Sequence, residues 1–508
     1  MKKANNKFNS SFGFILAAAG SSVGLGNLWS FPYKTSQNGG AAFVIIYLIS
    51  VLLFASFMSI AEIYIGKRAQ ANTVTAYKKI HKNLGWVGLL AIVAALIVIF
   101  YYSILGGYAV KFTVNSFSDN SDILKSFSNN GWEPILFTAI FLLLAVIIIS
   151  LGVKKGIENA SKILMPILII ALIGIVIYCL CLGEGVTEGL AFYLKPDFKE
   201  IGFKGILAAV GQAFFSLSVG VGCLTAYGSY MGQDFKIGRS MMWVAIFDSM
   251  VALLAGLAIF PAIYNYKAQT GIELQNNGIV LLFSSMPIIF AKLGIGGKIL
   301  SFVFFGMVSI AAITSVISVL EAVTQFLIQR FQLKRKIVST ILAVVALICS
   351  IPISLSLGHS INDENILLIG NKSLLEVLDT IINSLFIPVI ALNICIGIGW
   401  VLFKPKNKKE LFSTNALADN LRRDGLNLGK MNNVFAFIIK YVALILILII
   451  EVAGMIDAMF PIIDGKRQFV WGGFITIMIG IVVLAITITI YFVFLENKET
   501  GTNDDEIA

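Results

Sequence analysis

The sequence predicts an all-α integral membrane protein with about twelve transmembrane helices. Hydrophobic residues make up 58% of its 508 residues and charged residues only 13%, whereas a soluble domain carries roughly 25% charged residues. The apolar residues also fall into long runs, and a helix needs about 20 of them to cross the hydrocarbon core of a bilayer. These runs lack the polar–apolar alternation of a strand, so we interpret them as helices.

Twelve apolar runs are long enough to be membrane spans. They cover residues 12–33, 40–65, 86–111, 134–152, 160–182, 204–230, 239–265, 297–329, 337–357, 374–403, 432–455 and 469–495. If both termini are cytoplasmic, most of the 38 lysines and arginines fall on the cytoplasmic side, as the positive-inside rule requires. The net charge of +10 therefore reflects topology and does not indicate a nucleic-acid partner. We expect a multi-pass protein of the plasma (cytoplasmic) membrane.

The first span is interrupted near its middle. Gly20, Gly24 and Gly26 occur within seven residues and are followed by Asn27 and Pro32. A glycine costs about 1 kcal/mol in a helix interior, so three of them predict a break at membrane depth. Bare backbone is too costly in hydrocarbon unless it lines a cavity or contacts a ligand. We therefore expect this segment to surround something small and polar near the bilayer midplane.

The sixth span contains a second break, where Ser216, Ser218, Gly220 and Gly222 lie at mid-span. This break comes five spans after the first, so the two interrupted helices cross the membrane in opposite directions. Interrupted spans at matching positions of two halves mark the binding site of many transporters. We therefore predict a 5+5 inverted repeat of spans one to five and six to ten, with discontinuous helices 1 and 6.

The chain is expected to have four parts. A transport core covers residues 1–403, and a basic cytoplasmic linker covers 404–431. Two accessory spans follow within 432–495. The polar tail 496–508 is expected to be disordered.

Broken helices offer two kinds of binding group. Free N–H groups at a helix start attract anions, and free carbonyl, hydroxyl, amide and carboxylate oxygens coordinate cations. The candidates for one sodium cage are Ser22, Asn27, Ser216 and Asp248, and those for a second are Thr314 and Ser315. A charged Asp248 inside span seven is costly without a partner; the alternative is a protonated, hydrogen-bonded aspartate that only packs. The alternative for the two hydroxyls is bonding to their own helix backbone.

Several motifs occur together, in order and at characteristic separations. They are GSSVGLGN at 20–27 followed by Trp29 and FPY at 31–33, NGGAAF at 38–43, GQAFFSLS at 211–218, YGSY at 227–230, AGLAIFP at 255–261 and AAITS at 311–315. This set resembles the neurotransmitter:sodium symporter family, particularly its prokaryotic, leucine-transporter-like amino-acid branch. The resemblance covers spans one to ten and implies sodium-coupled uptake.

The resemblance implies a role for individual residues. The first sodium ion would be bound by Ser22, Asn27, Ser216, Asp248 and the substrate carboxylate. The second would be bound by Gly20, Val23, Ala311, Thr314 and Ser315. The substrate would contact Ser22, Leu25, Gly26, Val98, Tyr102, Phe215, Ser216, Ser218, Val221, Ser315 and Val319. The alternative for Tyr102 is an aromatic anchor at the membrane interface, which its depth within span three disfavours.

The outer gate departs from the family pattern. The resemblance implies an arginine in span one that pairs with an aspartate in span ten. The aspartate matches Asp379, but the arginine position is Ser30. Lys34, one helical turn later, is the candidate substitute.

The inner gate departs as well. The resemblance implies an N-terminal arginine that pairs with an aspartate at the end of span eight, and these positions are Asn5 and Gln329. Tyr230 of that network is retained. We therefore expect an uncharged, hydrogen-bonded latch on the inner side.

Two residues indicate the substrate and the ions. Amine transporters of this family carry an aspartate where this chain has Gly24, in place of a substrate carboxylate, so we expect an amino acid here. The apolar lining of the pocket favours a neutral, hydrophobic or aromatic one. Asp248 supplies a fixed negative charge beside the first sodium, which predicts chloride independence. By protonation on the return step, Asp248 would also support proton counter-transport.

We therefore predict a sodium-coupled symporter that imports this amino acid by alternating access. The coupling ions are two sodium ions, and no other cofactor is expected; the other partner is the lipid bilayer. The rival interpretations are a proton-coupled exchanger on the same scaffold and a non-transporting amino-acid sensor. An enzyme is not expected, because the sequence offers neither a nucleophile–base pair nor a metal-binding cluster.

Overall fold

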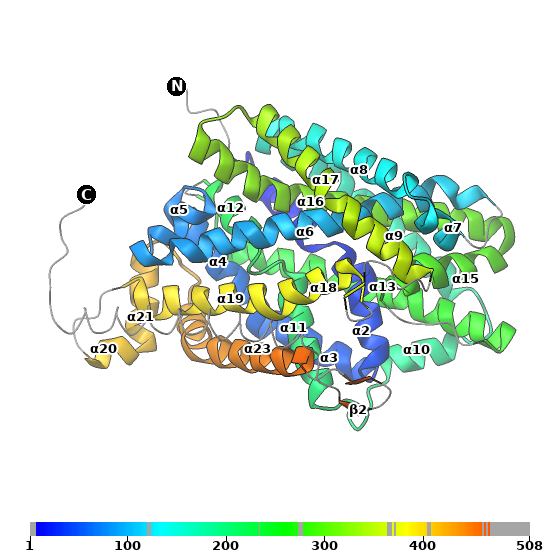
Figure 1. Cartoon of the computed structure of the whole chain (residues 1–508). Helices are drawn as coiled ribbons and strands as arrows, with labels where there is room; N and C mark the ends of the chain where they lie inside the picture. The colour runs from blue at the N-terminus through cyan, green and yellow to red at the C-terminus, as the bar shows by residue number, and fades with distance from the viewer. Residues whose placement is uncertain are drawn as a thin grey trace.

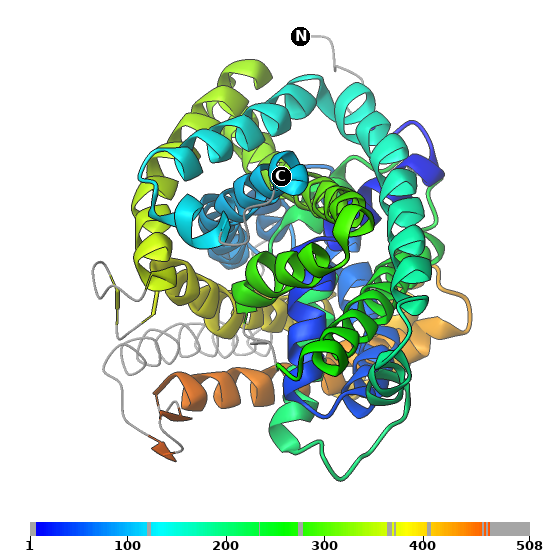
Figure 2. The same cartoon turned by 90° about the vertical axis from the view of Figure 1, so that its right-hand side faces the viewer.

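The computed structural model describes residues 7–118, 123–232, 234–272, 278–362, 368–369, 372–403, 408–459, 462–463 and 466–467. Within these ranges the chain is almost entirely helical, and the long helices run side by side (Figure 1). This confirms the predicted all-α membrane fold. Figure 2 views the molecule roughly along these helices, with α2 near the middle.

The first repeat contains spans one to five, and the label η marks a short 3₁₀ or π turn. Its elements are α1 (Ser11–Ser22), η1 (Gly26–Ser30), α2 (Phe31–Gln37), α3 (Ala41–Ser50), η2 (Val51–Ala55), α4 (Ser56–Ala69), α5 (Thr73–Lys78), η3 (Lys82–Leu84), α6 (Gly85–Val114), η4 (Asn115–Phe117), α7 (Ile123–Asn129), α8 (Glu133–Ser150), η5 (Val153–Glu158) and α9 (Asn159–Leu180). Span one is formed by α1 to α2, span two by α3 to α4, and spans three to five are centred on α6, α8 and α9.

The second repeat contains spans six to ten. Its elements, after the connecting α10 (Val186–Leu194), are α11 (Phe203–Ser216), α12 (Cys223–Ser229), α13 (Ile237–Thr270), α14 (Gly278–Val280), η6 (Leu281–Ser285), α15 (Met286–Lys292), α16 (Gly294–Phe331), α17 (Arg335–Ile361), α18 (Leu374–Ile381), η7 (Ile382–Phe386), α19 (Ile387–Ile396) and η8 (Gly397–Val401). Span six consists of α11 and α12, and span ten runs from α18 to η8.

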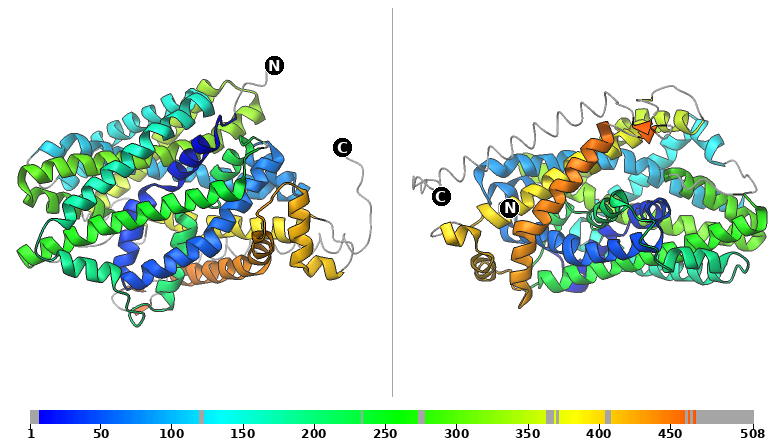
Figure 3. Two further views of the ribbon diagram at one scale, coloured as in Figure 1. Left: turned by 180° about the vertical axis from the view of Figure 1, so that it is seen from behind. Right: turned by 90° about the horizontal axis from the view of Figure 1, so that it is seen from below.

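The remaining described elements follow span ten. They are α20 (Lys408–Phe412), α21 (Thr414–Arg423), α22 (Met431–Phe437), η9 (Ile438–Val442), α23 (Ala443–Met459) and the two-residue antiparallel strands β1 (Ile462–Ile463) and β2 (Lys466–Arg467). Span eleven runs from α22 into α23, which packs against α19 and crosses the lower face of the molecule (Figure 3, right). The predicted span at 469–495 and the tail at 496–508 lie outside the described residues.

Both predicted breaks are present. Among the described residues, nine unbroken helices are long and apolar enough to cross a membrane. A tenth is the pair Ser11–Ser22 and Gly26–Gln37, which is bent by 50°. Span six is divided into α11 and α12, and between them the backbone of Gly220 has φ +84°, a left-handed conformation that favours glycine. The glycine clusters therefore end these helices as expected.

The two helices α4 and α12 are in backbone contact. A Cβ atom at Gly66 would lie 1.9 Å from the carbonyl oxygen of Thr225, and one at Gly228 would lie 2.3 Å from that of Ile63. Such an approach is open only to glycine. The second half of span two and the second half of broken span six therefore form one packed unit.

Candidate functional site

The break in span one meets the middle of span seven in a buried polar cluster. The Asn27 amide nitrogen donates to Asp248 Oδ1 at 2.9 Å and to Ser216 Oγ at 3.1 Å. Ser216 Oγ donates to Asp248 Oδ2 at 2.6 Å, and the Tyr47 hydroxyl donates to the same oxygen at 3.3 Å. Asn27 and Asp248, 221 positions apart in the chain, are both fully buried. Three residues predicted for the first sodium cage are therefore in direct contact.

The chemistry of this cluster suits a monovalent cation. The side chains that hold the Asp248 carboxylate are neutral donors, and a buried carboxylate is costly without a counter-charge. The Asn27 amide oxygen accepts the Gly24 N–H at 3.2 Å. Rotation of this amide would present its oxygen to an ion next to Asp248.

The residues predicted for the second cage also lie together. Ser315 Oγ lies 3.4 Å from the carbonyl oxygen of Gly20 and 3.3 Å from that of Val23. Thr314 Oγ1 donates to the Ala311 carbonyl of its own helix at 3.0 Å, as a helix threonine ordinarily does. Ser315 instead reaches across to the end of α1. Three oxygen atoms thus gather where span one breaks beside span eight. Thr314 is adjacent, since a Cβ atom at Gly20 would lie 3.2 Å from Thr314 Cβ.

A cavity of about 60 Å³ lies among the two broken helices and spans three, eight and ten. Its lining residues are Ser21, Ser22, Gly24, Gly26, Val98, Tyr101, Tyr102, Phe215, Ser216, Ser218, Val221, Ser315, Val316, Val319, Ile382 and Ile387. This set contains every predicted substrate contact except Leu25, whose N–H donates to the Tyr102 hydroxyl at 2.9 Å. Ile382 and Ile387 were not predicted, because nothing in the sequence of span ten marks the face that meets the break.

Gly24 leaves no room for a side chain. A Cβ atom there would lie 2.4 Å from Ser315 Oγ and 2.7 Å from the Tyr102 hydroxyl oxygen. Both oxygens belong to residues that line the cavity. The position is thus closed to an aspartate in this packing.

Glu62 in α4 is a site residue that the sequence did not indicate. Its carboxylate is fully buried, accepts the Gly220 N–H at 2.9 Å and accepts the Thr225 hydroxyl at 3.3 Å. It therefore satisfies donors that the break in span six sets free. An acidic residue inside an apolar span was the available signal.

At the predicted outer gate, Lys34 does not pair directly with Asp379. Its ammonium donates to Gln212 Oε1 at 2.9 Å and lies 5.8 Å from the centre of the Phe215 ring. Asp379 accepts instead from the Tyr101 hydroxyl at 3.0 Å. Phe215 lines the central cavity and also, with Lys34, a larger cavity of about 610 Å³. Ile387 also lines both cavities, whereas Lys34 lines only the larger one.

At the predicted inner gate, the expectation of an uncharged latch is wrong. The Tyr230 hydroxyl donates to Glu321 Oε1 at 2.6 Å, and Arg335 Nη2 donates to the same oxygen at 2.9 Å. Gln329 is occupied elsewhere, since it accepts from the Asn72 side chain at 2.7 Å. The charged pair was missed because Arg335 begins the next helix, and only the turn after span eight brings it back to Glu321. Asn5 lies outside the described residues.

Comparisons with known proteins show the family of this chain. The model of the sodium:neurotransmitter symporter family matches residues 5–133 and 122–497. The chain belongs to this family. A Haemophilus influenzae protein named an uncharacterized sodium-dependent transporter is 33% identical over 437 residues, which cover 81% of this chain and 92% of that protein. The Bacillus subtilis transporter YhdH, of the same description, is also 33% identical, with 83% of this chain and 91% of its own length covered.

A solved structure has the same fold. The crystal structure of MhsT in complex with L-phenylalanine superposes with a TM-score of 0.77 at 32% identity, and the match covers 88% of this chain and 99% of that one. This chain is therefore a sodium-dependent membrane transporter of the symporter family, with sodium as its coupling ion. The sequence-based assignment to the family is confirmed.

Proposed function

We propose that this symporter imports a neutral, hydrophobic or aromatic amino acid together with two sodium ions by alternating access. One observation carries the proposal. Two oxygen-rich clusters flank one small cavity, and the breaks of both discontinuous helices open onto it. Opposite ends of peptide dipoles are thus available to an amino acid and to cations at one place.

Coupling follows from a shared ligand. A substrate carboxylate near the N–H groups of Leu25 and Gly26 would lie next to the cluster of Asn27 and Asp248. A sodium ion there would complete the substrate site, and the substrate would complete the ion site. The second ion, at Ser315, would hold the end of α1 to span eight. Each sodium ion moved inward would contribute about 2.3 kcal/mol per 100 mV of membrane potential.

The cavity supports the proposed substrate class. Gly24 brings no charge and has no space for one, so the ligand must supply its own carboxylate. Val98, Val221 and Val319 are among the lining residues, and apolar walls favour an apolar side chain. MhsT, whose structure contains L-phenylalanine, has the same fold.

Asp248 supports chloride independence. Its carboxylate contacts Ser216 and Tyr47, two of the residues around which chloride-requiring members of the family bind the anion. A second negative charge there would be repelled. A proton on Asp248 during the return of the empty carrier would provide proton counter-transport.

The proposed topology places both termini in the cytoplasm and the chain in the plasma membrane. The proposed division remains a transport core of 1–403, a linker of 404–431, accessory spans in 432–495 and a tail of 496–508. On this orientation the Glu321–Arg335 pair closes the cytoplasmic side, and Lys34 with Phe215 closes the outer side.

Binding and flux measurements test the proposal. Purified protein is screened by scintillation proximity against the twenty amino acids, in sodium and in choline, and uptake is then measured in proteoliposomes. We expect sodium-dependent binding of a hydrophobic or aromatic amino acid, and uptake that persists when gluconate replaces chloride. Binding that is unchanged when choline replaces sodium would reject sodium coupling, and binding without flux would favour the sensor. Uptake driven by a proton gradient alone would favour the exchanger.

A further inference from the structure

The segment 408–428, between spans ten and eleven, is folded against the ends of the membrane helices. It contains α20 and α21, which lie at the left edge of Figure 1. Leu417, Ala418, Leu421 and Leu426 are buried and join the hydrophobic core. We call this segment the strut, because its two ends are held by different parts of the molecule.

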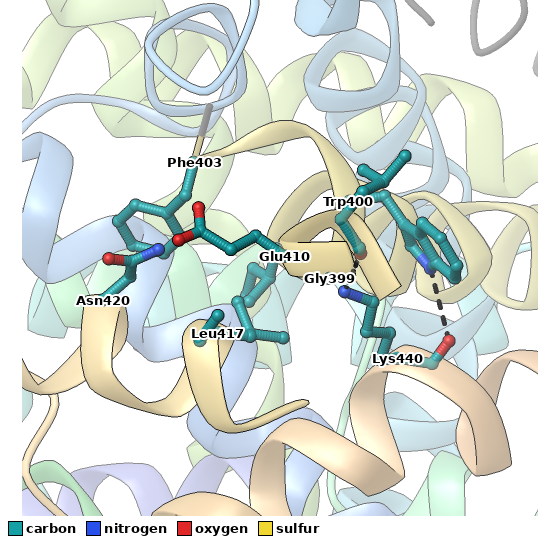
Figure 4. A pocket seen from close by; sticks show the side chains of 10 residues that line it. Gly399, Trp400, Phe403, Glu410, Leu417, Asn420 and Lys440 are labelled. Carbon is teal, nitrogen blue, oxygen red and sulfur yellow. Dashed lines mark hydrogen bonds between the residues drawn. The ribbon is translucent and has the colours of Figure 1, made fainter. Parts of the chain in front are cut away.

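The first end of the strut is anchored to spans ten and eleven (Figure 4). Lys440 in span eleven is 2% exposed, and its ammonium donates to the carbonyl of Leu411 and lies 4.7 Å from the centre of the Trp400 ring. The Trp400 indole N–H donates to the Lys440 carbonyl at 3.3 Å, and the Tyr441 hydroxyl donates to the Phe412 carbonyl at 2.6 Å. A buried ammonium that meets the carbonyl end of a helix is a durable anchor.

The second end is attached to spans two and seven. Asp424 accepts from the Tyr64 hydroxyl and from Arg68 Nε, the latter at 2.7 Å, and both donors lie in α4. We call these three residues the clasp. Leu428 packs on the start of α13, where a Cβ at Gly238 would lie 2.3 Å from its side chain.

The clasp is linked to the substrate site through α4. The backbones of α4 and α12 touch at Gly66 and Gly228, so these helices cannot shift separately without losing that contact. The α12 helix is the inner half of broken span six, and Ser218 just before it lines the central cavity. Motion of α12 that opens the cavity inward would therefore carry Tyr64 and Arg68 away from a strut that is anchored elsewhere.

We propose that the clasp is a latch between the strut and the α4–α12 unit, closed when the cavity is shut on the inner side and broken when it opens inward. The inference rests on the alternating access proposed above. The latch adds to the Glu321–Arg335 pair and acts on another helix. Asp424 is thereby a positioning residue, since it acts on the site through α4 and does not touch substrate.

Thiol labelling tests the latch. Cys223, the first residue of α12, is fully buried, so its reaction with a maleimide reports opening of this region. The more accessible Cys181 and Cys349 are first replaced by serine. In this background we compare Asp424→Asn with Asp419→Asn. The second variant removes the same charge from the solvent-exposed face of the strut, where Asp419 lies 3.8 Å from Arg422.

We expect Asp424→Asn to raise the labelling rate of Cys223 in choline by roughly two- to fivefold, the effect of losing one part-exposed ion pair. Asp419→Asn should leave the rate unchanged. Equal labelling rates in the two variants would overturn the proposal. Amino-acid binding is measured on the same samples. If the proposed function is wrong, sodium-dependent binding is absent from the parent protein too, which distinguishes this outcome from a failure of the latch.

A cross-link provides the opposite perturbation. Arg68→Cys and Asp424→Cys are combined in a background without the native cysteines and joined by a reducible bifunctional maleimide. We expect the linked protein to bind the amino acid but to lose most of its uptake, and reduction of the linker to restore uptake. Uptake at the unlinked rate would contradict the latch. If the double variant does not bind, the labelling comparison alone decides.

Discussion

Replacing Gly24 by alanine places a methyl group in the centre of the proposed site. Its carbon would lie 2.4 Å from Ser315 Oγ and 2.7 Å from the Tyr102 hydroxyl oxygen, both below the 3.0 Å that Cβ contacts in proteins respect. Gly24 does not have a left-handed backbone, so alanine fits the chain conformation and the perturbation is purely steric. Relief requires Tyr102 or Ser315 to move, and each belongs to the proposed substrate or sodium site.

The size of the effect follows from the cost of overpacking. An inserted methyl group in a packed site typically costs about 1–3 kcal/mol, which corresponds to roughly 5- to 150-fold weaker binding. The assay is equilibrium binding of the tritiated amino acid that the screen selects, in sodium. The matched control is Gly174→Ala in α9, where an added Cβ meets no atom within 4 Å.

The comparison separates local from general damage. We expect Gly174→Ala to bind as the parent does and Gly24→Ala to lose affinity while retaining its melting temperature within a few degrees. Full affinity in Gly24→Ala would refute the reasoning, because Tyr102 and Ser315 would then not enclose the bound amino acid as proposed.

The other predictions concern the ions and the two gates. Asp248→Asn should weaken sodium affinity at least tenfold, because the buried carboxylate is the main counter-charge for the ion. Added chloride should restore part of this affinity. A sodium titration in chloride and in gluconate measures both effects, and an unchanged titration would count against the site. Lys34→Ala should speed the escape of bound amino acid to the outer side by roughly tenfold, since a charged hydrogen bond to Gln212 is lost. The dissociation rate of the amino acid, measured in proteoliposomes, tests this, and an unchanged rate would contradict it. Glu321→Gln should leave Arg335 without its counter-charge, and should therefore lower the melting temperature and raise the labelling rate of Cys223. An unchanged labelling rate would exclude an inner gate at this pair.

Much of the transport core was accessible from local sequence. The apolar runs predict the spans because crossing a bilayer imposes a length, and glycine clusters predict the breaks because they weaken a helix wherever it lies. Residues Gly20 to Asn27 therefore indicated the break in span one without any knowledge of the helices that surround it. The motif pattern then nominated residues from four spans, and the folded chain brings them around one cavity.

The gates and the strut depended on tertiary structure. Whether Lys34 meets Asp379 or Gln212 is decided by how helices that are far apart in the chain pack together. Glu321 meets Arg335 only because the chain turns back after span eight.

By itself, the sequence determined that this chain is a membrane protein, where its helices are and which two of them are broken, because these properties depend on short stretches of residues and on the bilayer. Only the tertiary structure decided which polar groups become partners. Asn27 and Asp248, or Tyr64 and Asp424, are chemically ordinary until the packing of the helices brings them into contact. Partner choice is a property of the packed helices and not of any one segment.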